Sequence, residues 1–567
     1  MSITNSEIAS LFRKLADLLD IEGANPFRIR AYRQAALVID TFPRSIADMV
    51  ANGEDLSQLP GIGKDLAGKI QTIVKTGDFP TLDEVMERTP PVLTDLLQIP
   101  GLGPRKVELL YESLGVETLA DLETALRNGR VAGLPGFGPK TVSNLLAELE
   151  KLRLKGPEKR LPIVEADPIA ASLIRYLSAF EGVIKVQMAG SFRRRKETVG
   201  DLDIVAAARN GPGMIRYFCA FPDVRQVELR GVTRGTIILK SGLHVDLRVV
   251  GEKSYGTTLA YFTGARSHTI SIRKLAVKNG WKLNEYGLFD AAGKSLAGAD
   301  EQGLYKAFGM AWIPPELREM HGEMEAARSK NLPDLLPENA IKGDLRVASS
   351  VASLSELANR AGALGYEWIG IADPFPSDRS GRKKLQTRND RIDRFNAGGA
   401  AVHFFKTATI EIPLNGGLPD DSDLLTQLDY LCCYPANHAG SEGADPTESL
   451  IRTMDQAKAL DLPVILLQLT GRQINAQGRL HVNLDAMAEH AAKLGHAIEI
   501  CEQPDQLGVS DTQCQRLLQK GARLALASGA MSPTDLSMMK YAVWQARRGW
   551  AESRNVANCR HWKEVFR

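Results

Sequence analysis

The stretch AGSFRRRKETVGDLDIVAAA, Ala189–Ala208, decides the fold of the middle of the chain. Four consecutive cations lead into a Gly turn and then into an apolar run that holds two carboxylates, Asp201 and Asp203. In a strand, side chains alternate between the two faces, so both aspartates lie on one face while Leu202 and Ile204 lie on the other. Two adjacent carboxylates repel each other unless a cation lies between them. The stretch therefore predicts a strand with a metal-binding edge.

A second strand carries a third aspartate. In GLHVDLRVV (Gly242–Val250) apolar and polar residues alternate, and Asp246 lies on the polar face. Hard oxygen ligands of this kind suit Mg²⁺, with Mn²⁺ as an alternative ion. Three strand aspartates can hold two such ions, which is an arrangement used for phosphoryl transfer. The sequence thus predicts Asp201, Asp203 and Asp246 as metal ligands and catalytic residues.

A triphosphate would explain the cations before the first strand. Gly190 and Ser191 predict a turn whose hydroxyl and backbone N–H groups can hold a phosphate, and the Arg194 guanidinium can bind the β and γ oxygens. Residues 151–300 carry a formal charge of +11 and the remainder −9, which favours a polyanion partner. Two alternatives remain open at this point: a solvated helix surface with mixed charges, or an acidic protein partner.

Residues 1–150 are predicted to be helical and contain one motif three times. LPGIGK begins at Leu59, IPGLGP at Ile99 and LPGFGP at Leu134. Glycines before a helix permit positive φ and bring backbone N–H groups close to an anion, although an ordinary helix–helix turn is the alternative. The three copies resemble the helix-hairpin-helix motif, which binds DNA phosphates without reading sequence. The predicted DNA contacts are Gly61, Gly63, Gly101, Gly103, Gly136 and Gly138.

Composition limits the class of protein further. No run of about eighteen apolar residues could cross a membrane, and the N-terminal stretch predicts an amphipathic helix and not a signal peptide. We therefore expect a cytoplasmic protein. The six cysteines show no C-x-x-C spacing, so the sequence predicts neither a zinc site nor a disulfide framework.

At these motifs the chain resembles the family X DNA polymerases of the bacterial type. GSFRRRKETVGDLD matches the family's nucleotide-binding and Asp-x-Asp motifs, HVDLRVV matches its third-aspartate strand, and LAYFTGARSHTISIRKLAVKNGWKLNEYGLF resembles its thumb. Thr269 stands where the family usually has Asn, which weakens the implied contact with the nucleotide. The remaining roles that the resemblance implies are triphosphate binding by Gly190, Ser191, Arg194 and Gly200, sugar selection by Tyr261, Phe262 and Gly264, and a template contact by Arg273.

The N-terminal segment NPFRIRAYRQAALVI, Asn25–Ile39, resembles the small lyase domain of the family. That resemblance implies a Schiff-base lysine at Lys69, with Arg28 and Tyr32 as phosphate neighbours. The alternative is that Lys69 is an ordinary solvated lysine, because a nucleophilic lysine must be neutral.

From about Ile341 the chain resembles the polymerase-and-histidinol-phosphatase (PHP) module that bacterial members carry. The resemblance implies an α/β barrel, but most ligand positions of the family's metal site are changed. Without imidazole and carboxylate donors the metals would be lost, so we expect no phosphoesterase or 3′-5′ exonuclease activity. The changed positions are Arg346, Ala348, Pro374, Gln468, Gly529 and Met531, while Asp344, Asp373 and Glu411 remain.

The sequence thus predicts a multidomain α and α/β protein with a nucleotidyltransferase palm of mixed sheet and helices. The expected domains are a lyase-like helix-hairpin-helix domain (1–85), a fingers-like helix-hairpin-helix domain (86–155), the palm (156–253), a small α/β thumb (254–325), a linker (326–340) and the degenerate PHP-like barrel (341–567).

The predicted function is magnesium-dependent DNA polymerisation from dNTPs at short gaps in base excision repair, by a monomer associated with the bacterial nucleoid. The partners would be gapped or nicked DNA. A nucleotidyltransferase with another acceptor would not need three DNA-binding hairpins, and a non-catalytic DNA-end scaffold would not need three aspartates. These two alternatives stay open.

Overall fold

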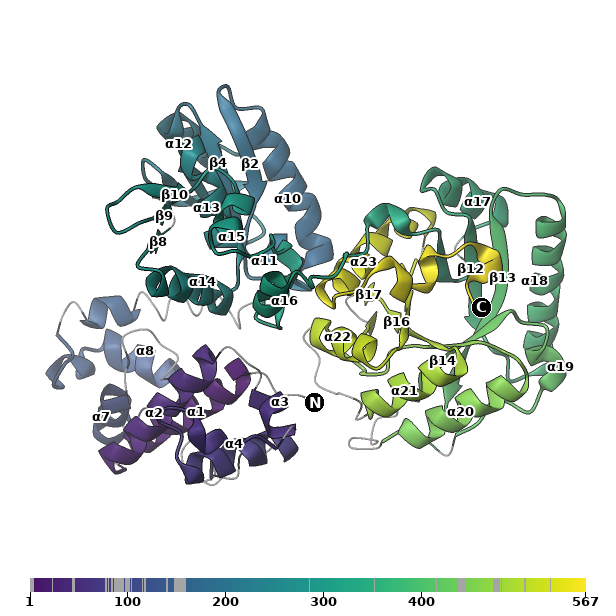
Figure 1. Ribbon diagram of the computed structural model, residues 1–567, viewed down its shortest axis with the longest axis horizontal. Coiled ribbons are helices and arrows are strands. Elements are labelled where there is room, and N and C mark those ends of the chain that lie inside the picture. The colour runs from purple at the N-terminus through teal and green to yellow at the C-terminus, as the bar shows by residue number, and fades with distance from the viewer. Residues whose placement is uncertain are drawn as a thin grey trace. The chain divides into compact units, whose positions relative to one another are not determined.

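The protein is represented by a computed structural model, whose described residues form two compact units. The first comprises Met1–Lys159 with Arg266–Lys274, and the second comprises Arg160–Ala265 with Leu275–Arg567 (Figure 1). The described residues are 5–22, 24–42, 46–51, 53–76, 79, 81–82, 85, 96, 102, 104–114, 116, 119–138, 141–146, 160–284, 286–350, 352–414, 416–436, 445–472, 480, 482–503, 506–530 and 532–566.

The first unit is helical throughout its described part, as the sequence predicts. Two packed helices form its centre, where the Phe12 ring lies 5.8 Å from that of Tyr32 and 5.1 Å from that of Phe79. The side chain of Asn25 accepts the Phe27 N–H and so caps the second helix. The elements are α1 (Asn5–Ile21), α2 (Pro26–Thr41), α3 (Ile46–Ala51), η1 (Leu56–Gln58), α4 (Lys64–Thr76), α7 (Pro104–Leu114), α8 (Leu119–Arg127) and η2 (Arg130–Gly133).

Two of the three glycine motifs have the same backbone structure. Gly61 (φ 80°) and Gly136 (φ 86°) both lie in the left-handed region. Each motif follows a short 3₁₀ helix, and each closes with matching hydrogen bonds, in which Ile62 N–H donates to Leu59 O and Phe137 N–H to Leu134 O. The repeat is therefore structural as well as sequential. Gly101 and Gly103 of the middle copy lie outside the described residues.

The second unit begins with a five-stranded mixed sheet in the order β2-β4-β7-β6-β5. Only the β4–β7 pair is parallel. Helices α10 and α12 cover the face that carries Leu202 and Ile204, while α13 packs on the opposite face, at Val205. The elements are β1 (Leu161–Pro162), α10 (Ile163–Ser178), β2 (Val183–Met188), α11 (Gly190–Arg193), β3 (Thr198–Val199), β4 (Asp201–Ala208), α12 (Gly211–Cys219), β5 (Val224–Arg230), β6 (Arg234–Leu239), β7 (His244–Val250), η3 (Glu252–Ser254) and α13 (Tyr255–Thr263).

A smaller three-stranded antiparallel sheet, ordered β10-β9-β8, follows the palm. Short helices precede and follow its strands, and turns lead from it into the C-terminal module. The elements are α14 (Arg266–Lys278), β8 (Lys282–Asn284), β9 (Gly287–Phe289), β10 (Ser295–Ala297), α15 (Glu301–Ala307), η4 (Pro315–Leu317), α16 (Glu323–Ser329) and η5 (Glu338–Ala340).

The C-terminal module is a nearly closed barrel of seven parallel strands, ordered β11-β12-β13-β14-β15-β16-β19, with helices on the outer side (Figure 1). Its elements are β11 (Gly343–Val347), α17 (Leu354–Ala363), β12 (Trp368–Pro374), α18 (Arg379–Ala397), β13 (His403–Ile412), α19 (Ser422–Leu425), β14 (Tyr430–Pro435), α20 (Thr447–Ala459), β15 (Val464–Leu466), α21 (Leu484–Leu494), β16 (Ala497–Ile500), β17 (Glu502–Gln503), β18 (Gln506–Leu507), α22 (Asp511–Gln519), β19 (Arg523–Leu526), η6 (Pro533–Met538), α23 (Met539–Arg548), η7 (Ser553–Asn555), η8 (Ala557–Cys559) and η9 (Trp562–Glu564).

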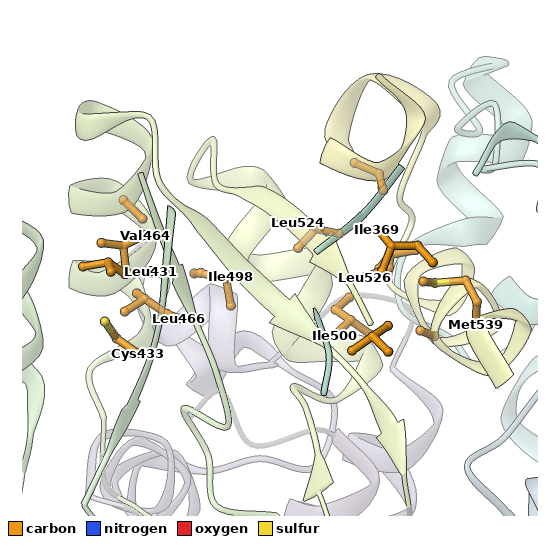
Figure 2. Close-up of a cluster of buried hydrophobic side chains, with 14 of the residues drawn as sticks. Ile369, Leu431, Cys433, Val464, Leu466, Ile498, Ile500, Leu524, Leu526 and Met539 are labelled. Atoms are coloured by element: carbon orange, nitrogen blue, oxygen red, sulfur yellow. The ribbon is translucent and has the colours of Figure 1, made fainter. Parts of the chain in front are cut away.

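Alternate residues of the barrel strands enter two different cores. Figure 2 shows the outer core, where Leu431 and Cys433 of β14 pack with residues of the neighbouring strands and the covering helices. Tyr430 and Cys432 enter the inner core with side chains from the C-terminal segment. The buried amide of Asn558 joins the first and last strands, since it donates to Gly343 O and Leu526 O and accepts the Leu526 N–H. Both faces are thus buried, as expected for a parallel sheet.

None of the described helices is long and apolar enough to cross a membrane. All six cysteines are free, and Cys219 and Cys559 are only half-buried.

Candidate active site

Three aspartates meet at the ends of β4 and β7. The two strands are parallel, and their register places Asp203 opposite Asp246 and Asp201 opposite His244. Carboxylate oxygens of the three aspartates all lie within 4.8 Å of one another. Within the described residues, no other group of three or more acidic, His or Cys ligands comes this close together. The structure thus brings together the three carboxylates that the sequence predicts as metal ligands.

Asp203 is partly buried, as is Asp246, whereas Asp201 is exposed. Burial, together with the negative charges of Asp201 and Asp246, raises the pKa of Asp203 to about 7, although Arg194 and Arg248 oppose the shift. A carboxyl group in such surroundings ionises readily only when a cation compensates its charge. The clustered oxygen donors fit a divalent cation such as Mg²⁺.

Asp246 is held in place by the neighbouring strand. Thr236 lies opposite it on β6 and donates its hydroxyl to Asp246 Oδ1 at 2.5 Å, while Arg234 donates to the same oxygen at 3.1 Å. These two hydrogen bonds fix the orientation of the carboxylate. Both are accepted by Oδ1, and neither involves Oδ2. Sequence reasoning missed Thr236, although it is the first polar side chain in an otherwise apolar run, TIIL.

Gly190 is required by its distance from Asp203. The residue has φ 57°, and a Cβ atom built on it would lie 2.1 Å from Asp203 Oδ2. The backbone is also joined there, because the Ala189 N–H donates to Asp203 O at 2.7 Å. The Gly190-Ser191 turn, which the sequence predicts to hold a phosphate, therefore adjoins the carboxylate cluster. Gly200, the other glycine predicted to lie near the triphosphate, directly precedes Asp201 in the chain.

The run of arginines is bound largely by protein groups. Arg193 forms two 2.8 Å hydrogen bonds with Glu301 and another with Thr263. Burial opposes ionisation of Glu301, but the hydrogen bonds and charges of Arg193 and Arg318 outweigh it and lower its pKa to about 2. Arg195, with φ 58°, lies 3.7 Å from the centre of a tryptophan ring of the C-terminal module. These two arginines do not fit the interpretation of the run as triphosphate ligands; they anchor the loop.

Arg194 remains the candidate triphosphate ligand. Its Nε donates to Glu319 at 2.8 Å, and its Nη1 donates to Thr263 O at the same distance. Neither Glu319 nor Glu301 was identified from the sequence, because carboxylates are common in the thumb and nothing marks these two.

The predicted sugar-selecting residues lie at the end of α13, which packs on the face of β4 that carries the aspartates. The rings of Tyr261 and Phe262 are 5.2 Å apart, and the Arg248 guanidinium lies 4.4 Å from the centre of the Phe262 ring. Gly264 ends the helix, with its N–H donated to Ala260 O.

Two other predicted residues, Thr269 and Arg273, lie on α14 in the segment Arg266–Lys274, which groups with the first unit. Their roles toward nucleotide and template stay predictions. Thr269 is half-buried and Arg273 is exposed.

The predicted lyase residues lie together in the first unit. Lys69 Nζ is 5.9 Å and Arg28 Cζ 5.8 Å from the centre of the Tyr32 ring. Lys69 also forms a 2.5 Å ion pair with Asp65, one helical turn earlier. A Schiff base at Lys69 would require this ion pair to open.

Arginines pair with two carboxylates of the PHP-like barrel, Glu499 and Asp373. Arg346 Nε donates to Glu499 at 2.6 Å, and Arg388 pairs with Asp373 at 3.1 Å. Asp344 is fully buried and accepts the Ser528 hydroxyl; burial raises its pKa to about 6. Glu411 lies exposed near the end of β13, and Met531 is outside the described residues.

Comparison with known protein families agrees with this architecture. Models described as DNA polymerase beta palm and thumb match residues 160–216 and 258–319. A helix-hairpin-helix domain matches residues 3–79, and a SAM-like helix-hairpin-helix tandem matches residues 93–151. The palm match includes Asp201 and Asp203 but ends before the strand that carries Asp246.

The chain belongs to the family X DNA polymerases, which are nucleotidyltransferases. It is 31% identical over 99% of its length to the DNA polymerase/3′-5′ exonuclease PolX of Bacillus subtilis, covering 98% of that protein. It is 27% identical to DNA polymerase lambda of Arabidopsis thaliana, over 56% of this chain and 62% of that one. The rat DNA polymerase lambda is 23% identical over 56% of each chain.

Replacing Gly190 with alanine is expected to reduce primer extension by about a hundredfold, because the new methyl group must displace the Asp203 carboxylate and small displacements in an active site cost this much. Extension of a primed template under steady-state conditions measures the loss. Gly182→Ala is the matched control, since Gly182 also has positive φ (85°) but its nearest neighbour would be Arg209 Cβ at 3.6 Å. An equal loss of primer extension in both variants would contradict the proposed clash between the Gly190→Ala methyl group and the Asp203 carboxylate.

Metal affinity is expected to depend on pH through Asp203. Below its pKa of about 7 the carboxyl group holds a proton that a metal ion must displace. Affinity for Mg²⁺ should therefore fall by up to about tenfold per pH unit below pH 7 and level off above it. Titration calorimetry in buffers of different ionisation enthalpy measures both the affinity and the released proton. A profile that is flat across neutral pH, or one unchanged in Asp203→Asn, would contradict this prediction.

Proposed function

We propose that this protein fills short gaps in DNA during repair by adding deoxynucleotides to a primer 3′ hydroxyl. The observation that carries the proposal is the carboxylate cluster of β4 and β7 beside the Gly190-Ser191 turn. The helix-hairpin-helix regions would hold gapped or nicked DNA through its phosphates, independently of sequence. The protein would act as a monomer in the bacterial cytoplasm.

In the proposed reaction, the primer hydroxyl attacks the α-phosphate of a dNTP. The new bond joins the primer oxygen to phosphorus, and the bond to pyrophosphate breaks. Asp246 would help to accept the hydroxyl proton, and its bonds from Thr236 and Arg234 would keep it oriented. Asp201, Asp203 and Asp246 would hold two Mg²⁺ ions, which supply electrostatic stabilisation of the hydroxyl and the triphosphate when bound.

The nucleotide would lie between the turn and the end of α13. Ser191 and Arg194 would bind the triphosphate, with the backbone of Gly190 and Gly200 close to it. Tyr261, Phe262 and Gly264 would contact the sugar and exclude a 2′ hydroxyl. Thr269 would make a weaker contact with the nucleotide than the usual Asn, and Arg273 would contact the template.

The first unit would add a lyase activity at the 5′ side of the gap. The proximity of Lys69 and Arg28 to the Tyr32 ring supports this proposal. Arg28 and Tyr32 would bind the 5′ phosphate, and Lys69 would attack the sugar after leaving Asp65.

The C-terminal barrel would have no 3′-5′ exonuclease activity. The name of the Bacillus subtilis relative includes that activity. In this chain, however, guanidinium groups pair with two carboxylates of the barrel, Arg346 with Glu499 and Arg388 with Asp373. A fixed organic cation cannot activate water as a bound metal ion does.

Replacing Asp203 with alanine should reduce filling of a one-nucleotide gap with a 5′ phosphate by at least about a hundredfold, because it removes a main electrostatic group of the reaction. DNA affinity should change little. Asp223→Ala, at an exposed aspartate of the same palm, should behave like the parent protein. Gap filling by Asp203→Ala at the parent rate would refute the proposed site.

Borohydride trapping tests the lyase proposal. The parent protein should form a covalent adduct with a 5′ deoxyribose phosphate, and Lys69→Ala should lose most of it because no other amine would occupy that position. Lys14→Ala, on a different helix of the same unit, serves as the control. An unchanged yield of adduct in Lys69→Ala would exclude this lysine.

The full chain carrying Asp203→Ala should show no 3′-5′ degradation of labelled single-stranded DNA with Mn²⁺ or Zn²⁺. That substitution suppresses pyrophosphorolysis by the polymerase site, so any cleavage would come from elsewhere. Metal-dependent cleavage that disappears after a further Asp344→Ala or Glu411→Ala change would show that the barrel is catalytic.

A further inference from the structure

Helix α23 of the C-terminal module contacts the loop that joins the Gly190-Ser191 turn to Asp201. Arg548 Nη1 donates to the backbone oxygen of Arg194 at 2.7 Å. Gln545 Nε2, one turn earlier on the helix, donates to Glu197 at 2.8 Å. Arg472 of the same module binds the other carboxylate oxygen of Glu197. The loop 194–197 is thus held at both ends by the module.

The middle of this loop is held by an aromatic ring. The Arg195 guanidinium lies 3.7 Å from the centre of the Trp544 ring, which is close enough for a cation–π contact. Arg195 has φ 58°, a left-handed conformation that is uncommon for residues with a side chain and costs free energy. The contact with Trp544 stabilises that conformation, so the module helps to determine the backbone path between the phosphate turn and the metal ligands.

A buried ionic network continues from Arg548 to the candidate triphosphate ligand. Arg548 is 2% exposed and donates to Glu319 Oε1 at 3.2 Å. Glu319 Oε1 also accepts a hydrogen bond from Arg194 Nε at 2.8 Å. Asp511 binds the other nitrogen of Arg548. Burial opposes ionisation of Glu319, but the charges of Arg548, Arg194 and Lys196 outweigh it and hold its pKa well below the usual range.

We infer that Arg548 is a positioning residue for nucleotide binding: it orients Arg194 through a shared carboxylate oxygen of Glu319 and through the Arg194 backbone. The inference rests on the proposed function, in which Arg194 binds the triphosphate. The C-terminal module is then a structural part of the nucleotide site, independently of any chemistry in its barrel.

Arg548 and Arg194 share the charge of Glu319. Without Arg548, this carboxylate keeps its negative charge with fewer cations and attracts Arg194 more strongly. The Arg194 guanidinium would then be drawn away from the triphosphate, while its backbone oxygen loses a donor. Both effects weaken nucleotide binding and leave the aspartates in place. Removal of Arg548 is therefore expected to raise the KM for dNTP and to change kcat less.

The test uses the full chain with Arg548→Met, which keeps an unbranched apolar stem and removes the charged guanidinium group. We expect KM for dNTP on gapped DNA to rise about tenfold, the effect of losing one charge-assisted hydrogen bond. The dissociation constant of the dNTP from the protein–DNA complex with Ca²⁺, measured without turnover, should rise equally. Arg548→Lys, which keeps the charge, should lie between Arg548→Met and the parent.

Arg547→Met is the matched control, because Arg547 is adjacent on α23 and also forms an ion pair, but donates its hydrogen bonds to Glu316 and Leu336 O and not to the loop. It should lose comparable thermal stability and keep the parent KM. A second substitution, Glu319→Gln, added to Arg548→Met should restore part of the dNTP affinity, because it removes the unbalanced charge.

An unchanged KM in Arg548→Met, or the same rise in Arg547→Met, would overturn the inference. If Arg548→Met does not fold, Arg548→Lys must show the KM increase, and its absence there overturns the inference as well. Failure of the proposed function has a different signature. The parent protein would then bind a dNTP in Ca²⁺, with the same response to Arg548→Met, but would not extend a primer. A parent protein that binds no dNTP would overturn both.

Discussion

Repulsion among three carboxylates on two parallel strands is the constraint around which the candidate active site is built. The β4–β7 pair is parallel within an otherwise antiparallel sheet, and its register places Asp203 opposite Asp246. Because Asp203 is also buried, its negative charge is unfavourable until a cation joins the cluster. The surrounding elements keep the carboxylates close together despite this cost: Gly190 leaves room for one, and Thr236 binds another.

The C-terminal barrel also has carboxylates whose negative charge must be balanced, but arginines balance it there. Glu499 and Asp373 are also carboxylates near strand ends, but the guanidinium groups of Arg346 and Arg388 balance them. Burial of the Arg346–Glu499 pair is compensated only while both partners remain, since either charge alone would be destabilised. An arginine can therefore compensate a buried carboxylate of this barrel and so help to preserve its fold.

Local sequence patterns predicted many of the strands and turns of this structure. The pairs formed between residues far apart in the chain could not be predicted from such patterns. Alternation in Asp201–Ala208 and His244–Val250 gives the strands and their polar faces, because the two-residue period is a backbone property. The Pro-Gly-x-Gly turns are local as well. The partners of the arginine run are different, since Arg193 meets Glu301 across 108 residues and Arg548 meets Arg194 across 354. A charge run shows that partners are needed, but only the fold identifies them.

Burial of the ionic network that joins Arg548 to Arg194 also has a thermodynamic consequence. Arg548, Glu319 and Arg194 are all nearly buried, so removing one charge leaves the others without compensation, at a cost of about 3–5 kcal/mol for a buried pair. The polymerase loop and α23 must therefore be retained together. Within the C-terminal module, the loop is held by α23 and by Arg472. The candidate site therefore depends on where α23 and Arg472 are placed, and so on the fold of the module that carries them.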